Sequence, residues 1–438
     1  MKYFGTDGIR QESTKFTTDF LTKIIKGLID YAGDEIKILL GGDTRESTEW
    51  ILADLESACE TFGIEYGNVG VLPTPAINYC FYQMGFDFAI DITASHNPYQ
   101  DNGIKIFERG SSSGQKLCSK GREAIELALA STEEYHLTSS TLRENLHNEA
   151  LGIYEEHIIN YLGNTDLANL NIGIDCANGA NSVIAKQIFK YFGAHPHIIN
   201  ADTSYNTKIN ANCGSTHLES LQNLVTEEHL DFGVAFDGDG DRCLMVDNSG
   251  KIIDGDHILA ILTSHLNLDK IATTVMANQG LLNWLKDNQI EAEITAVGDH
   301  NVAEAMREHN IRLGGEQSGH IILPEETTGD GVLTALMISK IIAESTESLN
   351  NLAKIITKFP QVIVNMPATQ KQKQTFKEKD LVKELLLDYN SKLTAVEGRL
   401  LVRPSGTEPL IRITMWGKNE DTISQLANEL KNKLGEIL

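Results

Sequence analysis

A polar loop that carries a serine and a histidine follows an apolar stretch early in the chain. The stretch runs from Phe86 to Ile92, and the next residues, 93–98, read TASHNP. In α/β proteins ligands and reacting groups gather at the carboxyl ends of strands. Ser95 is therefore a candidate to carry a transferred group, although serine before Asn-Pro is also an ordinary turn residue. His96 would either transfer a proton or only hydrogen-bond the group on Ser95.

Three aspartates alternate with glycines in a second polar loop, which reads DGDGDR from residue 237 to residue 242. In an extended chain Asp237, Asp239 and Asp241 point the same way, and the glycines let the backbone curl around one cation. Carboxylate oxygens favour Mg²⁺ or a similar hard ion. An EF-hand would need glycine in place of Arg242, and a DxDxT nucleophile would need threonine at 241. We therefore predict a metal site, with a solvated acidic turn as the alternative.

Basic residues stand close to both loops. Lys105 lies ten residues after Ser95, and near a bound metal its amine is expected to lose a proton easily, which suits a general acid or base. The plain alternative is a surface lysine. A serine near a divalent metal, a lysine and several arginines suits phosphoryl transfer, in which positioning and charge neutralisation dominate. A Ser-His-Asp hydrolase fits poorly, because adjacent serine and histidine side chains diverge and no GxSxG elbow is present.

Two further polar loops each follow an apolar, strand-like run. The first, GGEQSGH at 314–320, offers a carboxylate for paired sugar hydroxyls, or else a cap for the next helix. The second, RPSGTEP at 403–409, combines hydroxyls and a flexible backbone with flanking arginines, which together suit a phosphate. The candidate ligand-binding residues of these loops are Glu316, Ser318, His320, Arg403, Ser405, Gly406, Thr407 and Arg412.

A unit of strand, glycine-containing turn, helix and strand positions these loops. It recurs at about 36–72, 170–200 and 272–297, and each copy is followed by a further strand that ends in one of the first three loops. Helical connections of this length predict parallel strands. The fold class is therefore α/β, with three similar α/β domains and a smaller C-terminal α+β domain.

The expected domain boundaries fall in polar stretches near 131–149, 247–251 and 359–371. The first domain, with the serine loop, would cover residues 1–150, and the second, with the aspartate loop, 151–249. The third, with the sugar loop, would cover 250–362. The C-terminal domain, with the phosphate loop, would cover 363–438.

The composition limits the partners. The 438 residues include 61 acidic and 37 basic side chains, a net charge of −24, which argues against nucleic-acid and anionic-membrane partners. An anionic substrate must then meet local positive charge, for which Arg10, Lys105, Arg242, Arg403 and Arg412 are candidates. The six cysteines show no CxxC spacing, so neither zinc nor a disulfide framework is expected. The start lacks an apolar leader and no run approaches about 18 apolar residues, so we expect a cytoplasmic protein.

Together these motifs resemble the α-D-phosphohexomutase superfamily, and within it the family of bacterial phosphoglucosamine mutases. The resemblance spans the chain, from the FGTDGIR motif at 4–10 to the loop at 403–409. Gln317 and the TTGDG motif at 327–331 resemble the glucosamine branch, since the phosphomannomutase and phosphoglucomutase branch usually has methionine at the place of Gln317.

The resemblance implies four domains around a central cleft and a phosphoserine at Ser95. It implies that Asp237, Asp239 and Asp241 bind Mg²⁺ together with the phosphoseryl oxygen of Ser95. The implied reaction interconverts glucosamine 6-phosphate and glucosamine 1-phosphate through a bound 1,6-bisphosphate, on the route to UDP-N-acetylglucosamine. Glucosamine or glucose 1,6-bisphosphate would also act as activator, and a homodimer is common in the family. The implied catalytic residues are Ser95, His96, Lys105 and Arg10, and the implied substrate-binding residues are Arg242, His300, Glu316, Ser318, His320, Arg403, Ser405, Gly406, Thr407 and Arg412.

Two departures and two rival functions remain. The opening motif usually continues with glycine, where this chain has Gln11, and His300 stands where the branch usually has arginine. Histidine carries less charge at neutral pH, which puts a contact at His300 in question. One rival is a phosphomannomutase or phosphoglucomutase with the same machinery. The other is a phosphosugar-binding protein without activity, which the complete set of Ser95, three aspartates, Lys105 and Arg403 argues against.

Overall fold

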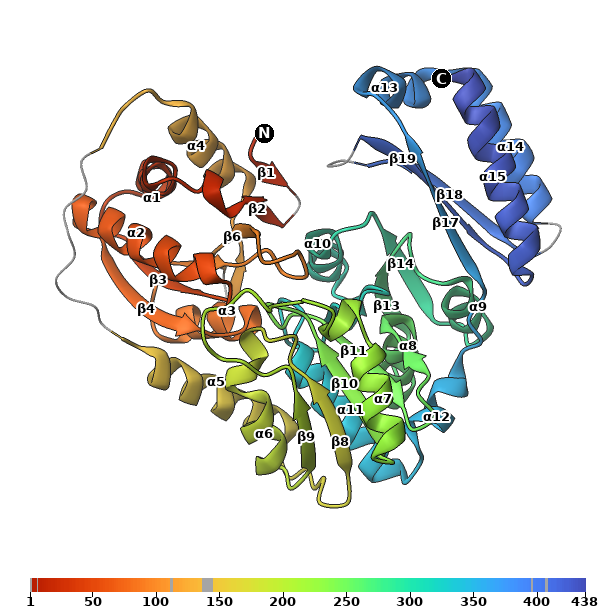
Figure 1. The fold of residues 1–438 in the computed structure, drawn as a ribbon, viewed down its shortest axis with the longest axis horizontal. Coiled ribbons are helices and arrows are strands. Elements are labelled where there is room, and N and C mark those ends of the chain that lie inside the picture. Colours follow the sequence, from red (N-terminus) through yellow and green to blue (C-terminus); the bar gives the residue numbers. More distant parts are fainter. Residues whose placement is uncertain (1, 6, 111–112, 136–144, 395–396, 406–408) are drawn as a thin grey trace.

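The structure is a computed structural model that describes residues 2–5, 7–110, 113–135, 145–394, 397–405 and 409–438. Within this part the strands form four separate sheets, which define three α/β units and a C-terminal unit (Figure 1). The first unit lies at upper left in Figure 1 and the C-terminal unit, in blue, at upper right. The predicted fold class is thus confirmed.

The first sheet places Ser95. Its strand β5 is buried along its whole length and pairs in parallel with β3 and antiparallel with β6. The order is β1-β2-β6-β5-β3-β4, with β7 on β6. The strands are β1 (Phe4–Gly5), β2 (Gly8–Glu12), β3 (Lys37–Gly42), β4 (Glu65–Val71), β5 (Phe88–Ile92), β6 (Asp101–Arg109) and β7 (Gly114–Lys116). The helices are α1 (Thr18–Ala32), α2 (Glu46–Phe62), α3 (Thr74–Gln83), α4 (Ser119–Ala130) and α5 (His147–Leu162).

The second sheet places the three aspartates, which follow β10. Its order is β12-β11-β10-β8-β9. The elements are β8 (Asn171–Asp175), α6 (Ala185–Tyr191), β9 (His195–Ile199), α7 (Glu219–Glu227), β10 (Phe232–Phe236), β11 (Cys243–Asp247) and β12 (Ile252–Ile253). The polar stretch 247–251 is the turn between β11 and β12, so it lies inside this sheet. Asp247 Oδ1 stabilises the turn by accepting from Ser249 N at 2.8 Å and from Lys251 N at 3.0 Å.

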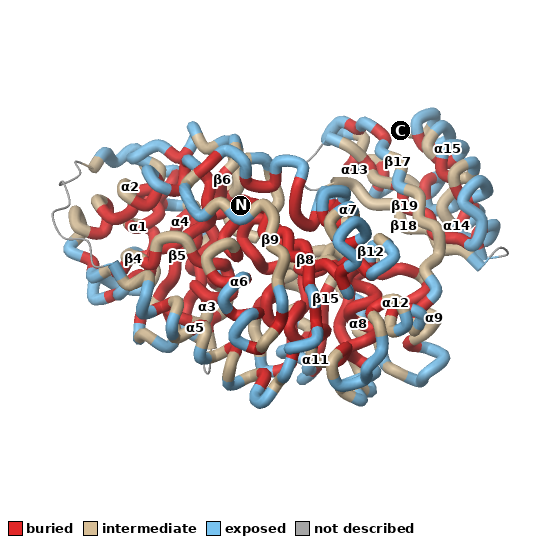
Figure 2. The backbone as a smooth tube through the Cα atoms, turned by 60° about the horizontal axis from the view of Figure 1, so that its bottom comes forward, coloured by how far each residue is buried: buried red, intermediate tan, exposed pale blue. Residues whose placement is uncertain are grey.

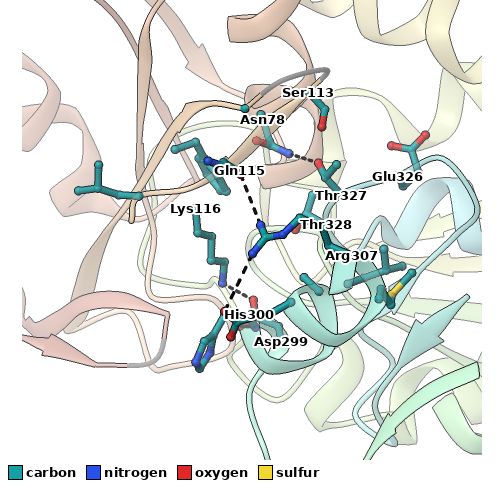
Figure 3. A pocket seen from close by; sticks show the side chains of 18 of the residues that line it. Asn78, Ser113, Gln115, Lys116, Asp299, His300, Arg307, Glu326, Thr327 and Thr328 are labelled. Carbon is teal, nitrogen blue, oxygen red and sulfur yellow. Dashed lines mark hydrogen bonds and ion pairs between the residues drawn. The ribbon is translucent and has the colours of Figure 1, made fainter. Parts of the chain in front are cut away.

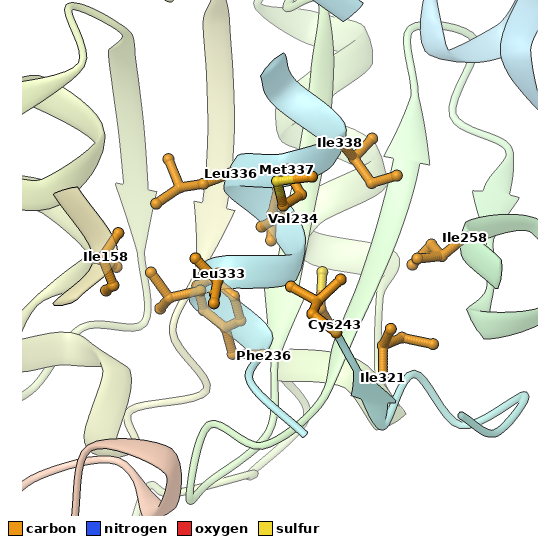
Figure 4. Close-up of a cluster of buried hydrophobic side chains, with 14 of the residues drawn as sticks. Ile158, Val234, Phe236, Cys243, Ile258, Ile321, Leu333, Leu336, Met337 and Ile338 are labelled. Carbon is orange, nitrogen blue, oxygen red and sulfur yellow. The ribbon is translucent and has the colours of Figure 1, made fainter. Parts of the chain in front are cut away.

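The third sheet, in the order β14-β13-β15-β16, carries the loop with Glu316. The elements are α8 (Gly255–His265), β13 (Lys270–Thr274), α9 (Gln279–Asp287), β14 (Glu291–Thr295), α10 (Asp299–His309), β15 (Gly314–Gly315), β16 (Ile321–Ile322), α11 (Gly331–Ser345) and α12 (Leu349–Leu352). Helix α11 is buried almost all round. Figure 4 shows Leu333, Leu336 and Met337 of this helix among side chains of the second and third units.

The C-terminal sheet, β17-β19-β18, is antiparallel throughout. The elements are β17 (Gln361–Pro367), α13 (Gln370–Glu378), α14 (Asp380–Thr394), β18 (Arg399–Pro404), β19 (Leu410–Trp416) and α15 (Glu420–Ile437). Strand β17 occupies the stretch expected to be a polar boundary. Its apolar residues alternate, with Val362, Val364 and Met366 packed on the core and Ile363 exposed, so it shows no continuous apolar run.

The predicted repeat is present in all three α/β units. The strand pairs β3 and β4, β8 and β9, and β13 and β14 are each parallel. The strand that leads into each loop, β5, β10 or β15, then pairs in parallel with the first strand of its copy of the repeat, β3, β8 or β13. The serine, aspartate and sugar loops therefore leave equivalent strand ends, as the sequence predicted.

The buried apolar side chains form several clusters. One includes residues of all three α/β units, from Leu39 to Ile356, and another lies within the first unit. The C-terminal unit has a cluster of its own, whose buried residues run from Met366 to Leu434. Figure 2 shows buried backbone running through the body formed by the α/β units, with exposed segments around it. None of the described helices is both long and apolar enough to cross a membrane.

Candidate active site

Ser95 sits in a strained turn just beyond β5 and is 1% exposed. Its φ angle is 52°, in the left-handed region that non-glycine residues rarely adopt. The backbone N–H of Ser95 donates to Thr93 Oγ1 at 2.8 Å. Its Oγ donates to Asp237 Oδ2 at 2.8 Å, across the boundary between the first and second units. The turn therefore aims the hydroxyl at the aspartate loop.

The three aspartates of that loop meet at one point. One carboxylate oxygen from each of Asp237, Asp239 and Asp241 lies within 4.8 Å of the others. Glycine allows the loop to come this close, since a Cβ on Gly238 would lie 2.7 Å from Ser95 O. Asp239 Oδ1 is buried and accepts no hydrogen bond from the described residues. Three buried carboxylates with an oxygen to spare fit a hard divalent cation.

Lys105, on β6, closes the aspartate cluster from the first unit. Its Nζ donates to Asp239 Oδ2 at 2.6 Å and to Asp241 Oδ2 at 2.9 Å, and lies 3.5 Å from Asp7 Oδ2. Burial would lower the pKa of Lys105, but these carboxylates together raise it well above its usual value. The chain's own carboxylates therefore keep Lys105 charged, and the expected loss of its proton beside a bound metal stays a prediction.

The carboxylates themselves differ in their electrostatics. Burial, together with Asp239 and Asp241, raises the pKa of Asp237 well above its usual range. Burial would also raise the pKa of Asp241, but Lys105 and His320 hold it well below that range. Arg242, the last residue of the same loop, also contacts Asp237. Its backbone N–H donates to Asp237 Oδ1 at 3.1 Å, and its Nε lies 3.7 Å from Asp237 Oδ2. Arg242, Lys105 and His320 thus each lie close to carboxylates of this loop.

His96 and Arg10 lie beside the serine. His96 Nδ1 is 3.4 Å from Ser95 Oγ. Burial, with Arg242 and Arg10, lowers the pKa of His96 to about 3. A neutral imidazole orients a group by hydrogen bonding rather than donating a proton, which favours the orienting role for His96. Arg10 is held by Asp7, to which its Nη2 donates.

The three candidate residues of the loop after β15, which are Glu316, Ser318 and His320, lie in different surroundings. His320 is buried, its Nδ1 lies 3.5 Å from Asp241 Oδ1, and its Nε2 accepts from Gly329 N, so it faces the aspartate loop. Glu316 Oε1 accepts from Gly298 N at 3.2 Å, next to the first turn of α10. It does not cap the helix that follows, α11, because Asp330 does so. Ser318 Oγ is buried and has no hydrogen-bond partner among the described residues.

Gln317, whose identity indicated the glucosamine branch, contacts the C-terminal unit. Its Nε2 donates to Gln361 Oε1, in the first residue of β17, at 3.2 Å. The sugar loop thus touches the strand on which the C-terminal unit begins.

The C-terminal unit presents two arginines side by side. Arg403 of β18 is paired in register with Arg412 of β19. Burial and Arg412 lower the pKa of Arg403, while Glu316 of the third unit raises it. Ser405 O accepts from Lys373 Nζ at 2.7 Å. Gly406 and Thr407, the rest of the expected phosphate loop, lie outside the described residues.

A cavity of about 940 Å³ opens between the first and third units, and Figure 3 shows Gln115, Lys116 and Asp299 around it. Asp7, Lys105 and His320 lie in its wall. Lys116 bridges Asp7 of the first unit and Asp299 of the third. His300 also lines the cavity, and its Nδ1 is buried without a partner among the described residues. Burial lowers the pKa of His300, so it adds no charge there at neutral pH.

Several residues around the site were missed from the sequence. Arg45 and Asp43 lie behind Ser95, Lys116 binds Asp7, and Lys373 supports Ser405. A signal existed for the first two, because GGDTR at 41–45 is also a polar loop at the end of a strand. It was interpreted only as the turn of the repeat.

Comparison with known proteins follows the same division of the chain. The descriptions "Phosphoglucomutase/phosphomannomutase, alpha/beta/alpha" domain I, domain II and domain III match residues 1–136, 153–250 and 254–359, and the description of the C-terminal domain matches 363–433. Among solved structures, a phosphoglucomutase/phosphomannomutase family protein from Burkholderia thailandensis is 19% identical, with a TM-score of 0.76 over 99% of this chain and 96% of that one. Aspergillus fumigatus N-acetylphosphoglucosamine mutase, in complex with GlcNAc-6P and magnesium, has a TM-score of 0.65 at 16% identity over 98% and 95% of the chains.

Full-length relatives are closer in sequence. The phosphoglucosamine mutase of Caldicellulosiruptor bescii is 40% identical over 98% of both chains. That of Clostridioides difficile is 39% identical over 100% of this chain and 99% of its own. The chain therefore belongs to the phosphoglucomutase/phosphomannomutase family and, within it, to the phosphoglucosamine mutases.

Proposed function

We propose that this isomerase interconverts glucosamine 6-phosphate and glucosamine 1-phosphate, with phosphorylated Ser95 as donor and acceptor of the phosphoryl group. The observation that carries the proposal is the 2.8 Å hydrogen bond from Ser95 Oγ to Asp237, which places the hydroxyl at a buried group of three carboxylates. No carboxylate cluster of this kind is needed to hold a simple turn. It suits a group that bears several negative charges together with a cation.

The residues that would hold Mg²⁺ are Asp237, Asp239 and Asp241, with a phosphoryl oxygen on Ser95. When bound there, the ion would neutralise charge on the phosphoryl group during transfer. The partnerless Asp239 Oδ1 and the three converging carboxylates support this assignment.

In the first transfer, a bond forms between the phosphorus and the free hydroxyl oxygen of the sugar while the bond to Ser95 Oγ breaks. The sugar hydroxyl must give up its proton. Lys105 is the candidate acceptor if another cation engages Asp239 and Asp241, because these two carboxylates, together with Asp7 and Asp91, keep its ammonium charged. His96, being neutral, orients the phosphoryl group on Ser95, and Arg10 adds positive charge beside it.

The product of this transfer is a 1,6-bisphosphate, which returns its other phosphate to Ser95 after turning over in the site. The rest of the site must therefore accept either end of the sugar. Glu316 and Ser318 would bind hydroxyls, and Arg242 and His300 would contact the substrate near the aspartate loop and in the cavity. His320 would fix Asp241. The second phosphate would bind the C-terminal unit at Arg403, Ser405, Gly406, Thr407 and Arg412.

Glucosamine or glucose 1,6-bisphosphate would prime Ser95 and restore it when the intermediate escapes. The 1-phosphate would feed the synthesis of UDP-N-acetylglucosamine and cell-wall precursors in the cytoplasm. The family's common homodimer is the assembly we would test first.

Phosphorus NMR tests the function directly. Phosphorylated protein with Mg²⁺ and a trace of glucose 1,6-bisphosphate is given glucosamine, glucose and mannose 6-phosphates in parallel, with Ser95→Ala as control. Fastest conversion of glucosamine 6-phosphate supports the proposal. Faster conversion of glucose or mannose 6-phosphate would support the same mechanism with a different sugar as substrate. Absence of any turnover would favour a phosphosugar-binding protein without activity.

A further inference from the structure

Arg45 is a fully buried arginine whose side chain donates most of its hydrogen bonds to the loop that carries Ser95. It follows β3 and precedes α2, and it is 0% exposed. Its Nη2 donates to Ser95 O at 2.8 Å and to Asn97 O at 2.9 Å. Its Nη1 donates to Pro98 O at 2.5 Å and to Asp101 O at 3.0 Å. Four of the five N–H donors of a guanidinium are thus bound to carbonyls of one short loop.

Asp43 accepts a hydrogen bond from the guanidinium of Arg45. Through Thr93 it also helps to hold the backbone N–H of Ser95. Arg45 Nε donates the fifth hydrogen bond to Asp43 Oδ2 at 3.0 Å. The same carboxylate oxygen accepts from Thr93 Oγ1 at 2.7 Å, and Thr93 Oγ1 accepts from Ser95 N at 2.8 Å. Burying a guanidinium and a carboxylate is costly unless every donor is satisfied, as it is here. The network therefore fixes both the N–H and the carbonyl of Ser95.

The second unit binds the same carbonyl. Asn210 Nδ2 donates to Ser95 O at 2.8 Å and to Asn97 O at 3.2 Å. Ser95 O is thus held by Arg45 from the first unit and by Asn210 from the second. A φ of 52° is an unfavourable backbone conformation for a non-glycine residue, so Ser95 needs such contacts to hold it.

We propose that Arg45 is a positioning residue for phosphoryl transfer, with Asn210 as its counterpart. By holding the Ser95 carbonyl, these two residues keep Oγ, and the phosphoryl group that it would carry, aimed at the aspartate loop. The inference rests on the proposed function. Since Arg45 is fully buried and is not among the residues that line the cavity, its loss should lower kcat and leave KM nearly unchanged.

The test compares Arg45→Lys with Arg109→Lys. Arg109 is a matched control because its Nη1 also donates to two backbone carbonyls of the first unit, Tyr82 O at 2.9 Å and Phe86 O at 3.0 Å, away from Ser95. Misplacing a reacting atom by about 1 Å costs about 100-fold in rate. We expect Arg45→Lys to lower kcat by about 30- to 100-fold with KM within about twofold, and Arg109→Lys to change neither.

Asn210→Ala keeps the inference testable if Arg45→Lys folds poorly. It should lower kcat by a smaller factor, and its effect should not add to that of Arg45→Lys, because both variants release one carbonyl. The inference would be overturned by a kcat for Arg45→Lys within about threefold of wild type, by a loss carried by KM, or by an Asn210→Ala variant with unchanged kcat. Wild-type protein assayed in parallel separates the two proposals, since absent wild-type turnover would overturn the proposed function and this inference with it.

Discussion

Asn278 and Phe359 exchange two hydrogen bonds: Asn278 Nδ2 donates to Phe359 O at 3.0 Å, and Phe359 N donates to Asn278 Oδ1 at 2.9 Å. Phe359 belongs to the segment that leads from the third unit into β17. Asn278 also begins α9, where its Oδ1 accepts from Gly280 N at 2.9 Å. One buried amide therefore caps a helix and anchors the entry to the C-terminal unit.

Asn278→Ala should lower stability, because it removes the helix cap and leaves two backbone groups of Phe359 unpaired. Loss of a cap and of buried hydrogen bonds costs about 1–3 kcal/mol. Urea unfolding measures the difference. Asn288→Ala is the control, since the exposed Asn288 donates only to Trp284 O. Equal midpoints for the two variants would contradict the anchoring role.

Ser95→Ala should abolish mutase turnover and leave the fold intact. The variant loses the oxygen that would carry the phosphoryl group, while the backbone contacts with Arg45, Thr93 and Asn210 remain. Turnover is measured by the NMR assay and folding by circular dichroism. A rate within about tenfold of wild type would exclude Ser95 as the phosphoryl carrier.

Chelation should remove activity, and added Mg²⁺ should restore it and raise the Tm. A cation that binds only the folded state stabilises it by an amount that grows with the logarithm of its concentration over its dissociation constant. Asp239→Ala should abolish the rise in Tm, because it removes a buried carboxylate oxygen that has no hydrogen-bond partner among the described residues. Asp247→Ala, in the β11–β12 turn, is the control and should keep the rise. A rise of equal size in Asp239→Ala would place the ion elsewhere.

Asp256 should make stability fall as the pH rises from about 4 to about 7. Burial and the neighbouring Asp254 raise its pKa from 3.8 to about 7, against the opposing charges of Lys358 and Arg399. Over this window the folded state keeps a proton that the unfolded chain releases, so the folded state loses its advantage as pH rises. Each pKa unit is worth about 1.4 kcal/mol, which makes the total a few kcal/mol.

Asp256→Asn removes this dependence, because the amide cannot ionise and can still accept from Asn278 N. Unfolding in urea at pH 5 and at pH 8 measures the effect as the difference between variant and wild type, which cancels the titration of other groups. We expect the free energy of unfolding of the variant, relative to that of wild type, to be higher at pH 8 than at pH 5. No gain would mean that Asp256 ionises as an ordinary aspartate.

The sequence predicted the parts of the site that are local. Apolar strands followed by polar loops located Ser95, the aspartates and Glu316, because parallel strands bring their carboxyl ends together. It did not reveal properties that depend on several distant residues. The charged state of Lys105 follows from Asp7, Asp239 and Asp241 meeting it at once. Arg45 binds backbone carbonyls about fifty positions away, which leave no pattern in side-chain types.

Strand β17 was missed for a different reason. It is half exposed, and its polar residues Gln361 and Asn365 and the terminal Pro367 hide the alternation of its apolar residues. The position of His300 beside Asp299 and at the wall of the cavity could not be inferred from the sequence.

The C-terminal unit has a hydrophobic cluster of its own, apart from the cluster that joins the three α/β units, so we expect it to unfold separately from them. The three α/β units share one continuous apolar cluster, so the loss of any one exposes the packing surfaces of the others. The C-terminal unit buries its own cluster and shares little with the rest. Its melting need not coincide with that of the larger body, and calorimetry should then record more than one transition. Destabilising substitutions in the C-terminal unit would consequently remove the arginine pair while leaving a folded, phosphorylatable Ser95 behind.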